Sequence, residues 1–592
     1  MAFLEDWKRD CYCAQVTQHD ANRTMTLMGW VQRRRDFGEI IFVWLRDRTG
    51  LVQIVFEKSD NPALFLEADA ALRNECVIAV RGEIALRTKE NINPDMETGM
   101  VEMRVHELKI LSTSEVLPFP IEDETNASEL TRMKYRYLDL RRPVMQNIIK
   151  TRHLATQTIR RYLDERGFIE IETPILMRST PEGARDYLVP SRLHKGEFYA
   201  LPQSPQLLKQ ILMVSGFDKY YQLARCFRDE DLRADRQPEF TQIDIEMSFV
   251  EMEDIMQLSE GLLNEIFLTV LGHEMPKMVR MPYAQAMAQY GSDKPDIRFG
   301  LTLTDVSAFG KNCGFSVFEN ARGIQALNVK GSAKDFSRKE LDRLAVFVKQ
   351  FGAKGLAWAV LEDGEVRSSF AKNMHAESFA QMVAALQGET GDLLLFIADE
   401  SAYAALIAMG QLRLELGKRL NLYNPDAYAP LWVTEFPFFE LDEETGKYLP
   451  MHHPFTCPLE EDMEFIETEP GRVRAKCYDI VINGVELASG SIRIHSKELQ
   501  ERMFSALDIT MEEAHNKFGY LLEAFQYGPP PHGGIAPGLD RLLMLLLKTE
   551  SIREIVAFPK LQNASDPLTG APGKPDAAQL KELGITILSG ND

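Results

Sequence analysis

The sequence has little cysteine and lacks a long apolar segment. Its seven cysteines are scattered over 592 residues and predict no disulfide framework. Cys11 and Cys13 have no second Cys or His pair at zinc-ligand spacing, so we interpret them as incidental. No apolar run approaches the roughly 20 residues that a membrane-spanning helix needs. The first residues lack the basic flank and apolar core of a signal peptide. We therefore expect a cytoplasmic protein.

The sequence also has fewer basic than acidic residues. The formal net charge of −21 argues against bulk, non-specific binding of nucleic acid, because a phosphate backbone attracts a positive surface. It does not exclude local basic patches, so it is a weak objection to an RNA partner. The length allows several domains, and 45% hydrophobic with 26% charged residues is ordinary for a globular protein.

The first 112 residues contain short alternating segments separated by Gly, Asn and Asp turn signals. These segments cover residues 25–31, 39–45, 51–56, 76–81 and 100–110. This density of short strands favours an OB-type β-barrel, a fold that commonly binds single-stranded nucleic acid. Arg33-Arg34-Arg35, with Phe42 and Gln53 on strands beside it, would supply charge, a stacking surface and a base-edge reader. Taken alone, a solvated charge cluster with a core phenylalanine is the simpler interpretation.

A polar loop between two strand-like runs carries the strongest signal. From Phe240 to residue 248 polar and apolar residues alternate, which predicts a strand with Asp244 and Glu246 on its polar face. Residues 220–227 predict a second strand, antiparallel to the first. A solvated sheet face is the common alternative for such a pattern.

A Gly-rich turn near the other end of the chain leads into an arginine-bearing helix. Residues 533–541 end in Arg541, and arginines can neutralise phosphate oxygens. Phe240 and Arg541 could therefore enclose a purine ring. Residues 542–547 are apolar on all sides and predict a buried helix, in which Arg541 needs an anionic partner; a nucleotide such as ATP fits this need better than a structural carboxylate.

Three ordered motifs resemble those of the class II aminoacyl-tRNA synthetases. Residues 167–174 resemble motif 1, Arg228-Asp229-Glu230 with the following strand resembles motif 2, and residues 538–541 resemble motif 3. From end to end the chain resembles the bacterial-type aspartyl-tRNA synthetases. The resemblance implies ligation of L-aspartate to tRNA-Asp through an aspartyl-adenylate, with ATP as substrate and Mg²⁺ as cofactor. It also implies a homodimer built through motif 1.

The expected fold class is multidomain, β and α/β. We expect an OB-fold anticodon-binding domain at 1–112, a linker at 113–142, and a class II catalytic domain of antiparallel sheet and helices at 143–298 and 431–569. Residues 299–430 carry none of the motifs and predict an α+β insertion domain. Residues 570–592 are assigned to a C-terminal extension.

The resemblance assigns site residues position by position. It implies catalytic roles for Arg228, Glu230 and Arg541. It implies an aspartate pocket made by Glu182, Ser204, Gln206, Lys209, Asp244, His452 and Arg493. It implies an ATP site made by Arg228, Asp229, Glu230, Gln237, Phe240, His453, Glu486, Gly538, Leu539, Asp540 and Arg541. It implies anticodon binding by Arg35, Phe42, Gln53 and Glu102. Ser204 also reads as the N-cap of a helix.

A two-residue turn brings two acids together. Asn483-Gly484 is a strong hairpin signal, and it would place Glu486 opposite Val481 and one diagonal step from Asp479, on the same face. Two converging carboxylates repel unless a cation lies between them. Mg²⁺ held by Asp479 and Glu486 with ATP phosphates is favoured over two solvent-exposed acids.

Selection of aspartate over its amide can be argued from charge. Lys209 and Arg493 could pair with the side-chain carboxylate of the substrate, and Asp244 would hold Lys209 or the substrate ammonium. Asparagine would leave both cations uncompensated in a desolvated site. Arg493 has the wrong parity on its strand unless Ser489-Gly490 forms a bulge.

Other functions compete with this interpretation. An asparaginyl- or lysyl-tRNA synthetase would use the same scaffold, and a catalytically inactive synthetase-like protein would bind RNA or amino acids only. The presence of Arg228, Asp479, Glu486 and Arg541 argues against an inactive protein. Charging of tRNA-Asn besides tRNA-Asp stays open; Phe37, beside the predicted anticodon surface, lies where that selectivity would be set.

Overall fold

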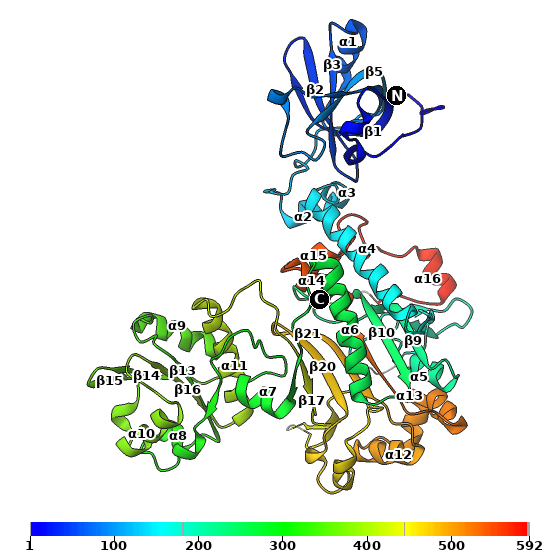
Figure 1. Cartoon of the computed structure of the whole chain (residues 1–592). Coiled ribbons are helices and arrows are strands. Elements are labelled where there is room, and N and C mark those ends of the chain that lie inside the picture. Colours follow the sequence, from blue (N-terminus) through cyan, green and yellow to red (C-terminus); the bar gives the residue numbers. More distant parts are fainter. Residues whose placement is uncertain (1, 180–182, 443–444, 589–592) are drawn as a thin grey trace. The chain divides into compact units, whose positions relative to one another are not determined.

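The computed structural model describes residues 2–179, 183–442 and 445–588 of the chain (Figure 1). These residues form two compact units. The first contains residues up to 150 with two short C-terminal stretches, 557–561 and 565–572, and the second contains residues 151–556 and 562–564 and the segment from 573 onward. No helix of the described ranges is both long and apolar enough to cross a bilayer.

A closed barrel with strand order β1-β2-β3-β5-β4 forms the first unit's core. Its strands are β1 (Thr24–Asp36), β2 (Ile40–Arg46), β3 (Leu51–Glu57), β4 (Val77–Leu86) and β5 (Val101–Ser112). Helix α1 (Pro62–Ala71) follows β3; the Asn61 side chain caps it and Pro62 occupies its first turn. Alternate strand residues such as Leu27, Val43 and Ile54 point inward and are fully buried. The predicted OB-type barrel is confirmed.

Two short helices, α2 (Glu129–Lys134) and α3 (Arg136–Asp139), lie where a linker was predicted. Helix α4 (Pro143–Asp164) follows them.

An eight-stranded sheet with strand order β11-β17-β20-β21-β22-β10-β9-β6 is the centre of the second unit. In chain order its strands are β6 (Ile169–Glu170), β9 (Lys219–Phe227), β10 (Glu239–Ser248), β11 (Val279–Pro282), β17 (Pro430–Thr434), β20 (Cys477–Ile482), β21 (Val485–Ile492) and β22 (His532–Pro537). Neighbours are antiparallel except β11 with β17 and β6 with β9. Helix α5 (Gln206–Val214) contacts β10 and β9, α6 (Met252–Leu271) contacts β22, and α14 (Leu539–Leu547) contacts β10.

The alternation along β10 sorts its residues as predicted, but its polar face is not solvated. Ile243 and Ile245 are buried on one face, and Asp244 and Glu246 are fully buried on the other. The structure therefore excludes the alternative of a solvated sheet face.

Helix α14 forms where a buried helix was predicted, but it is buried only in part. Leu542, Leu543 and Leu546 are buried, whereas Met544 and Leu545 are only half-buried. The predicted buried helix is therefore buried along one face, which includes Leu539, Leu542, Leu543 and Leu546, and α14 contacts β10, α6 and α15.

The hairpin between β20 and β21 forms at Asn483-Gly484, and both residues have positive φ, of 54° and 81°. Glu486 pairs with Val481 as predicted. The bulge, however, lies at Leu487, where the register shifts, and Ser489-Gly490 pairs regularly with Asp479 and Tyr478. The predicted position of the bulge is therefore wrong. Its consequence holds, because one extra residue before Ala488 restores the parity of Arg493.

Residues 304–419 form a separate sheet with helices on both faces, as the α+β prediction requires. Its strand order is β12-β13-β16-β14-β15. The strands are β12 (Thr304–Asp305), β13 (Gly323–Val329), β14 (Ala357–Glu362), β15 (Glu365–Ser368) and β16 (Leu393–Asp399). The helices are α8 (Ser316–Glu319), α9 (Arg338–Lys349), α10 (Ala376–Ala385) and α11 (Ala402–Arg419). Along β16, Leu395 belongs to one buried cluster and Phe396 to the other, so both faces are covered.

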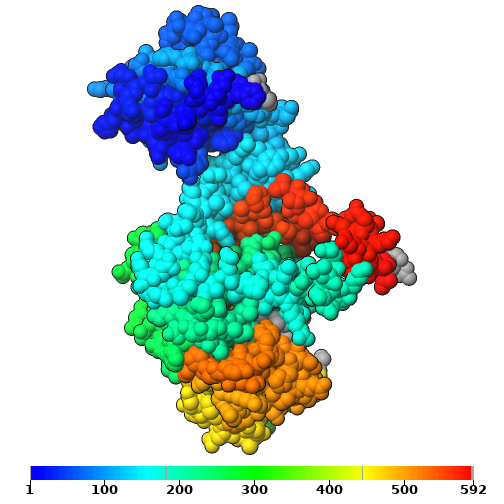
Figure 2. Space-filling model, turned by 90° about the vertical axis from the view of Figure 1, so that its right-hand side faces the viewer, coloured from blue at the N-terminus to red at the C-terminus, as the bar shows by residue number. Residues whose placement is uncertain are grey.

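Smaller elements complete the second unit. They are the strand pairs β7 (Leu188–Pro190) with β8 (Phe198–Ala200) and β18 (Phe439–Leu441) with β19 (Tyr448–Pro450), and the helices α7 (Tyr283–Tyr290), α12 (Lys497–Ala506), α13 (Met511–Ala524), α15 (Ile552–Ile555) and α16 (Ala577–Leu583). Helix α16 buries none of its residues, and Figure 2 shows this red segment on the surface.

Candidate active site and nucleic-acid interface

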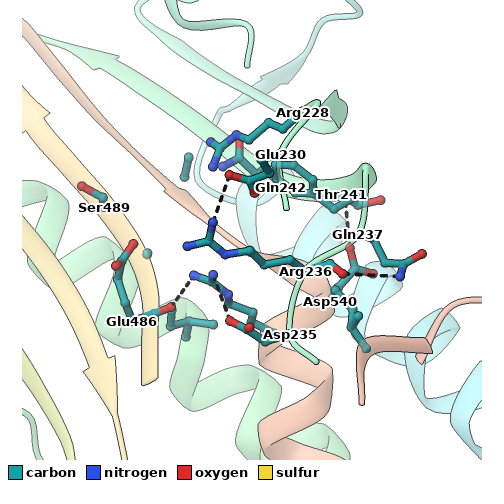
Figure 3. Close-up of a pocket in the computed structure, with 17 residues that line it drawn as sticks. Arg228, Glu230, Asp235, Arg236, Gln237, Thr241, Gln242, Glu486, Ser489 and Asp540 are labelled. Carbon is teal, nitrogen blue, oxygen red and sulfur yellow. Dashed lines mark hydrogen bonds and ion pairs between the residues drawn. The ribbon is translucent and has the colours of Figure 1, made fainter. Parts of the chain in front are cut away.

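A cavity of about 160 Å³ lies between the loop after β9, the hairpin β20–β21 and the start of α14 (Figure 3). Three distant parts of the chain therefore meet there. The predicted ATP-site residues that line it are Arg228, Glu230, Gln237, Phe240, Glu486, Gly538, Asp540 and Arg541. Of the others, Leu539 is buried, Asp229 forms a backbone bridge with Arg185, and His453 contacts a different cluster.

The cationic groups of this cavity have partners within the chain. The guanidinium carbon of Arg228 lies 5.1 Å from the ring centroid of Phe240, a cation–π distance. Arg541 pairs with Asp235 at 3.2 Å and donates to the backbone oxygen of Glu486 at 3.0 Å. Within the described residues, the anionic partner of Arg541 is therefore the structural carboxylate of Asp235. Arg236 similarly pairs with Glu230 at 3.0 Å, as Figure 3 shows.

Asp540 uses both carboxylate oxygens inside the protein. Oδ2 accepts the backbone N–H of Thr241 at 2.8 Å, and Oδ1 accepts from Nη1 of Arg152 in α4 at 2.5 Å. Nη2 of Arg152 also donates to Thr241 Oγ1 at 3.2 Å. Asp540 is only 2% exposed. These bonds fix the start of α14 against β10, directly beside Arg541 and Phe240.

A second cluster of charged residues is buried on the polar face of β10. Lys209 Nζ lies 2.7 Å from Asp244 Oδ1 and 3.3 Å from Glu246 Oε2. Nε of Arg493 lies 3.0 Å from Glu246 Oε1. The structure therefore brings together Lys209, Asp244 and Arg493, which the sequence placed in one pocket. The structure adds Glu246, which pairs with both Lys209 and Arg493. In the sequence, Glu246 could have been found from the alternation that places it on the same strand face as Asp244.

Gln206 of the predicted aspartate pocket and His453 of the predicted ATP site contact Arg493. Nη1 of Arg493 contacts His453 Nε2 at 2.5 Å, and Nη2 donates to Gln206 Oε1 at 3.3 Å. The ring of His452 packs edge-on against Phe436, with centroids 5.0 Å apart.

Burial and the charge of Arg493 set the protonation of these histidines. Desolvation, and then Arg493, lower the pKa of His452 to about 4 and that of His453 well below its ordinary value. Both rings are therefore neutral near pH 7. Burial also raises the pKa of Asp244. Burial acts the same way on Glu246, but the charges of Arg493 and Lys209 outweigh it and hold the pKa of Glu246 below its usual value.

Asp479 and Glu486 converge as the hairpin register predicts. Burial and the neighbouring Glu486 raise the pKa of Asp479 well above its usual value. In the described structure Asp479 Oδ1 is buried without a hydrogen-bond partner. A buried orphan oxygen beside a second carboxylate fits a divalent cation. Within the described ranges no group of three or more His, Cys, Asp or Glu side chains is arranged for a metal, so such a cation would need further ligands from substrate or water.

Sequence reasoning missed Gln203, which anchors the loop before it. Its side chain accepts from Ala184 N at 3.1 Å and donates to Asp186 Oδ1 at 2.6 Å. Glu182, predicted to contact the substrate ammonium, lies outside the described residues. Ser204 is not the N-cap of α5: Pro205 holds that position, and Ser204 Oγ accepts from Gln206 N at 3.3 Å.

The barrel carries a cleft of about 470 Å³ on one side. All four residues predicted to bind an anticodon line it, namely Arg35, Phe42, Gln53 and Glu102. Nε2 of Gln53 donates to Glu102 Oε2 at 2.8 Å, so these two side chains orient each other.

Two aromatic residues extend this cleft. Trp44, which sequence reasoning missed, lies beneath the guanidinium groups of Arg33 and Arg35, at 5.5 and 5.4 Å. In the sequence, Trp44 could have been found because it follows Phe42 by two residues and so lies on the same strand face. Phe37 is 68% exposed and meets Phe42 edge-on, with centroids 5.7 Å apart. The cleft thus combines cations with the exposed ring of Phe37 and the half-buried rings of Phe42 and Trp44, a combination suited to unpaired bases.

Comparison with known proteins identifies the class that this fold and site define. Residues 128–562 match the family described as tRNA synthetases class II (D, K and N), and residues 25–111 match the OB-fold nucleic acid binding domain. The chain belongs to the class II tRNA synthetases. It is 53% identical to the aspartate–tRNA ligase of Ruminiclostridium cellulolyticum over 98% of each chain. Within the class, it therefore belongs to the aspartate–tRNA ligase family.

Two further likenesses bear on tRNA choice and on the fold. The chain is 51% identical to a protein of Thermoanaerobacter sp. named aspartate–tRNA(Asp/Asn) ligase, over 99% of each chain. A solved structure of asparaginyl-tRNA synthetase from Pyrococcus horikoshii, complexed with asparaginyl-adenylate, aligns with a TM-score of 0.59. It covers 93% of this chain and 98% of that one, at 19% identity, and shows the fold alone.

Proposed function

We propose that this protein ligates L-aspartate to tRNA-Asp in two steps that use ATP. The α-carboxylate of aspartate attacks the α-phosphorus of ATP, which releases pyrophosphate and forms aspartyl-adenylate. The terminal ribose of tRNA then takes the aspartyl group and AMP leaves. The observation that carries the proposal is the buried cluster of Lys209, Asp244, Glu246 and Arg493 beside the cavity of Phe240.

Aspartate selection follows from the charges of that cluster. Lys209 and Arg493 would receive the side-chain carboxylate of the substrate, while Asp244 and Glu246 hold the two cations in place. The neutral histidines beside Arg493 add no charge of their own. Asparagine would bring an NH₂ group against two cations, a mismatch that is costly where water is excluded.

In the first step the protein would mainly align aspartate with ATP, and it would form no covalent bond with either substrate. Phe240 and Arg541 would enclose the purine, and Arg228 would bridge the α-carboxylate and the α-phosphate, where negative charge develops. Asp479 and Glu486 would hold Mg²⁺. When bound, that ion would neutralise charge on the departing pyrophosphate.

The remaining parts of the proposal concern partners. The barrel cleft would bind the anticodon of tRNA-Asp, with Phe42 as a stacking surface. The motif 1 segment would build a homodimer. Ligation of aspartate to tRNA serves protein synthesis, and this supports a cytoplasmic location.

Aminoacylation with labelled L-aspartate tests the function directly. We expect purified tRNA-Asp to be charged; tRNA-Asn in parallel distinguishes a strict enzyme from a relaxed one. Charging of both would agree with the Asp/Asn name of the Thermoanaerobacter relative. If a folded protein charges neither, the enzyme proposal fails and a synthetase-like binding protein becomes the better account.

Replacing Phe42 by alanine tests the anticodon site independently of the aminoacyl-adenylate site. We expect the KM for tRNA-Asp to rise about tenfold or more, because base–aromatic stacking contributes about 1–3 kcal/mol per base. Aspartate-dependent ATP–pyrophosphate exchange, which needs no tRNA, should not change. Leu66, an exposed apolar residue on α1, provides a control as Leu66→Ala. Equal losses in both assays would show that Phe42 acts through folding instead.

A further inference from the structure

The segment that leads from α7 toward the insertion is anchored at several points. Asp296 is buried and pairs with Arg298 at 2.7 Å. Nη2 of Arg413, from α11, donates to the backbone oxygen of Asp296 at 2.9 Å. Ser292 Oγ accepts the N–H of Lys294 at 3.1 Å. These contacts fix the backbone on both sides of Lys294.

This segment packs against the tip of the hairpin β20–β21. A Cβ placed on Gly484 would lie 3.3 Å from Asp296 Cβ and 3.8 Å from the backbone oxygen of Lys294, so the glycine permits a close approach. The hairpin is also the element that carries Glu486. Packing of the two segments therefore sets where the side chain of Lys294 can reach.

The ammonium of Lys294 reaches the proposed cation site. Its Nζ lies 4.0 Å from Glu486 Oε2 and 3.9 Å from Asp293 Oδ1. Both distances exceed that of a hydrogen bond, so neither carboxylate holds the ammonium tightly. The side chain is 48% exposed, in contrast to the buried Lys209. Lys294 is the only side chain in the described ranges that forms an ion pair with Glu486.

Two other cations near this site have closer ion-pair partners. Arg541 pairs with Asp235 at 3.2 Å and Arg236 with Glu230 at 3.0 Å. Lys294 is held less closely than either, and it lies beside the two carboxylates that would hold Mg²⁺. Lysine binds phosphate groups as a compact point charge that needs no fixed fork geometry.

We infer that Lys294 binds the β- and γ-phosphate groups of ATP, and hence the pyrophosphate that leaves in the first step. This inference rests on the proposed function. No bond to Lys294 forms or breaks: the ammonium stays protonated and moves from Glu486 toward the phosphates. Its positive charge would stabilise the negative charge that the leaving group gains, in addition to any bound Mg²⁺.

The test uses Lys294→Met and Lys294→Arg in the full chain. Binding of ATP and of AMP is measured separately, together with the KM for pyrophosphate in ATP–pyrophosphate exchange. For Lys294→Met we expect ATP affinity and the KM for pyrophosphate to worsen about tenfold or more. AMP affinity and the KM for aspartate should not change, because AMP lacks the β- and γ-phosphates. Lys294→Arg should restore most of the loss.

Lys354→Met is the matched control. Lys354 is an exposed lysine of the insertion that pairs with Glu400 at 2.9 Å, and its loss should alter none of these values. If Lys294→Met leaves the ATP affinity and the KM for pyrophosphate unchanged, the inference is overturned, and Lys294 then only forms a surface ion pair with Glu486. Equal weakening of AMP would also overturn it, because the effect would then come from the shape of the cavity. Absence of exchange in the unaltered protein would instead refute the proposed function, so the two failures are distinguishable.

Discussion

Replacing Arg493 by leucine is expected to lower aspartate-dependent ATP–pyrophosphate exchange by about a thousandfold. The substitution removes one of the two cations proposed to receive the substrate carboxylate. It also leaves Glu246, which is fully buried, with Lys209 as its remaining ion-pair partner in the described structure. The KM for aspartate should account for most of the loss, whereas the KM for ATP should change little. Arg493→Lys should recover only part of the activity, because an ammonium cannot reproduce the guanidinium fork.

The matched control for this variant is Arg280→Leu. Arg280, on β11, pairs with Glu253 at 2.8 Å and Glu260 at 2.6 Å, and all three side chains are partly exposed. Its removal should have little effect on exchange, since exposed ion pairs contribute little. Discrimination against asparagine gives a second measurement: it should fall in Arg493→Leu. A variant that keeps both aspartate activation and discrimination would refute the proposed role of Arg493.

Replacing Arg152 by alanine is expected to destabilise the protein by about 3 kcal/mol and to raise the KM for ATP. The change leaves the nearly buried carboxylate of Asp540 without its cation and removes the bond from Arg152 to Thr241 Oγ1, so that, within the described residues, the backbone N–H of Thr241 alone holds Asp540. Arg541 and Phe240 are the chain neighbours of Asp540 and Thr241, so the proposed purine clamp should loosen. Denaturant unfolding gives the stability, and exchange kinetics give the KM for ATP and for aspartate.

The same helix supplies a control for Arg152. Arg160 pairs with Glu170 at 3.0 Å, but both side chains are partly exposed, so Arg160→Ala should cost less than about 1 kcal/mol. The KM for aspartate should stay constant in Arg152→Ala, because the cluster around Lys209 is not touched. A variant that loses stability with an unaltered KM for ATP would show that Arg152 supports the fold without positioning the clamp.

Local sequence patterns predicted the elements that carry the site. The alternation after Phe240 predicts β10, and Asn483-Gly484 predicts the hairpin with Glu486 opposite Val481. These features depend on residues close together in the chain, so a short window contains the information. The motifs likewise placed Lys209, Asp244 and Arg493 in one pocket through resemblance, although their roles there stay proposals.

Contacts between segments far apart in the chain could not be predicted from local sequence patterns. Gly490 suggested a bulge, yet a Cβ there would lie 2.4 Å from the backbone oxygen of Gly534 in β22. That glycine serves close packing of neighbouring strands, and the bulge lies at Leu487. In the same way, the pairing of Arg541 with Asp235 depends on a loop three hundred positions earlier in the chain.

The sequence by itself determined the barrel, the two central strands, the hairpin and the family, because periodicity, turn residues and ordered motifs are local. Only the tertiary structure decided that Asp244 and Glu246 are buried and that Asp540 is occupied by Arg152 and Thr241. The physical reason is that burial of a charge requires a partner from elsewhere in the fold. Lys209 on α5 and Arg493 beyond β21 supply that partner here.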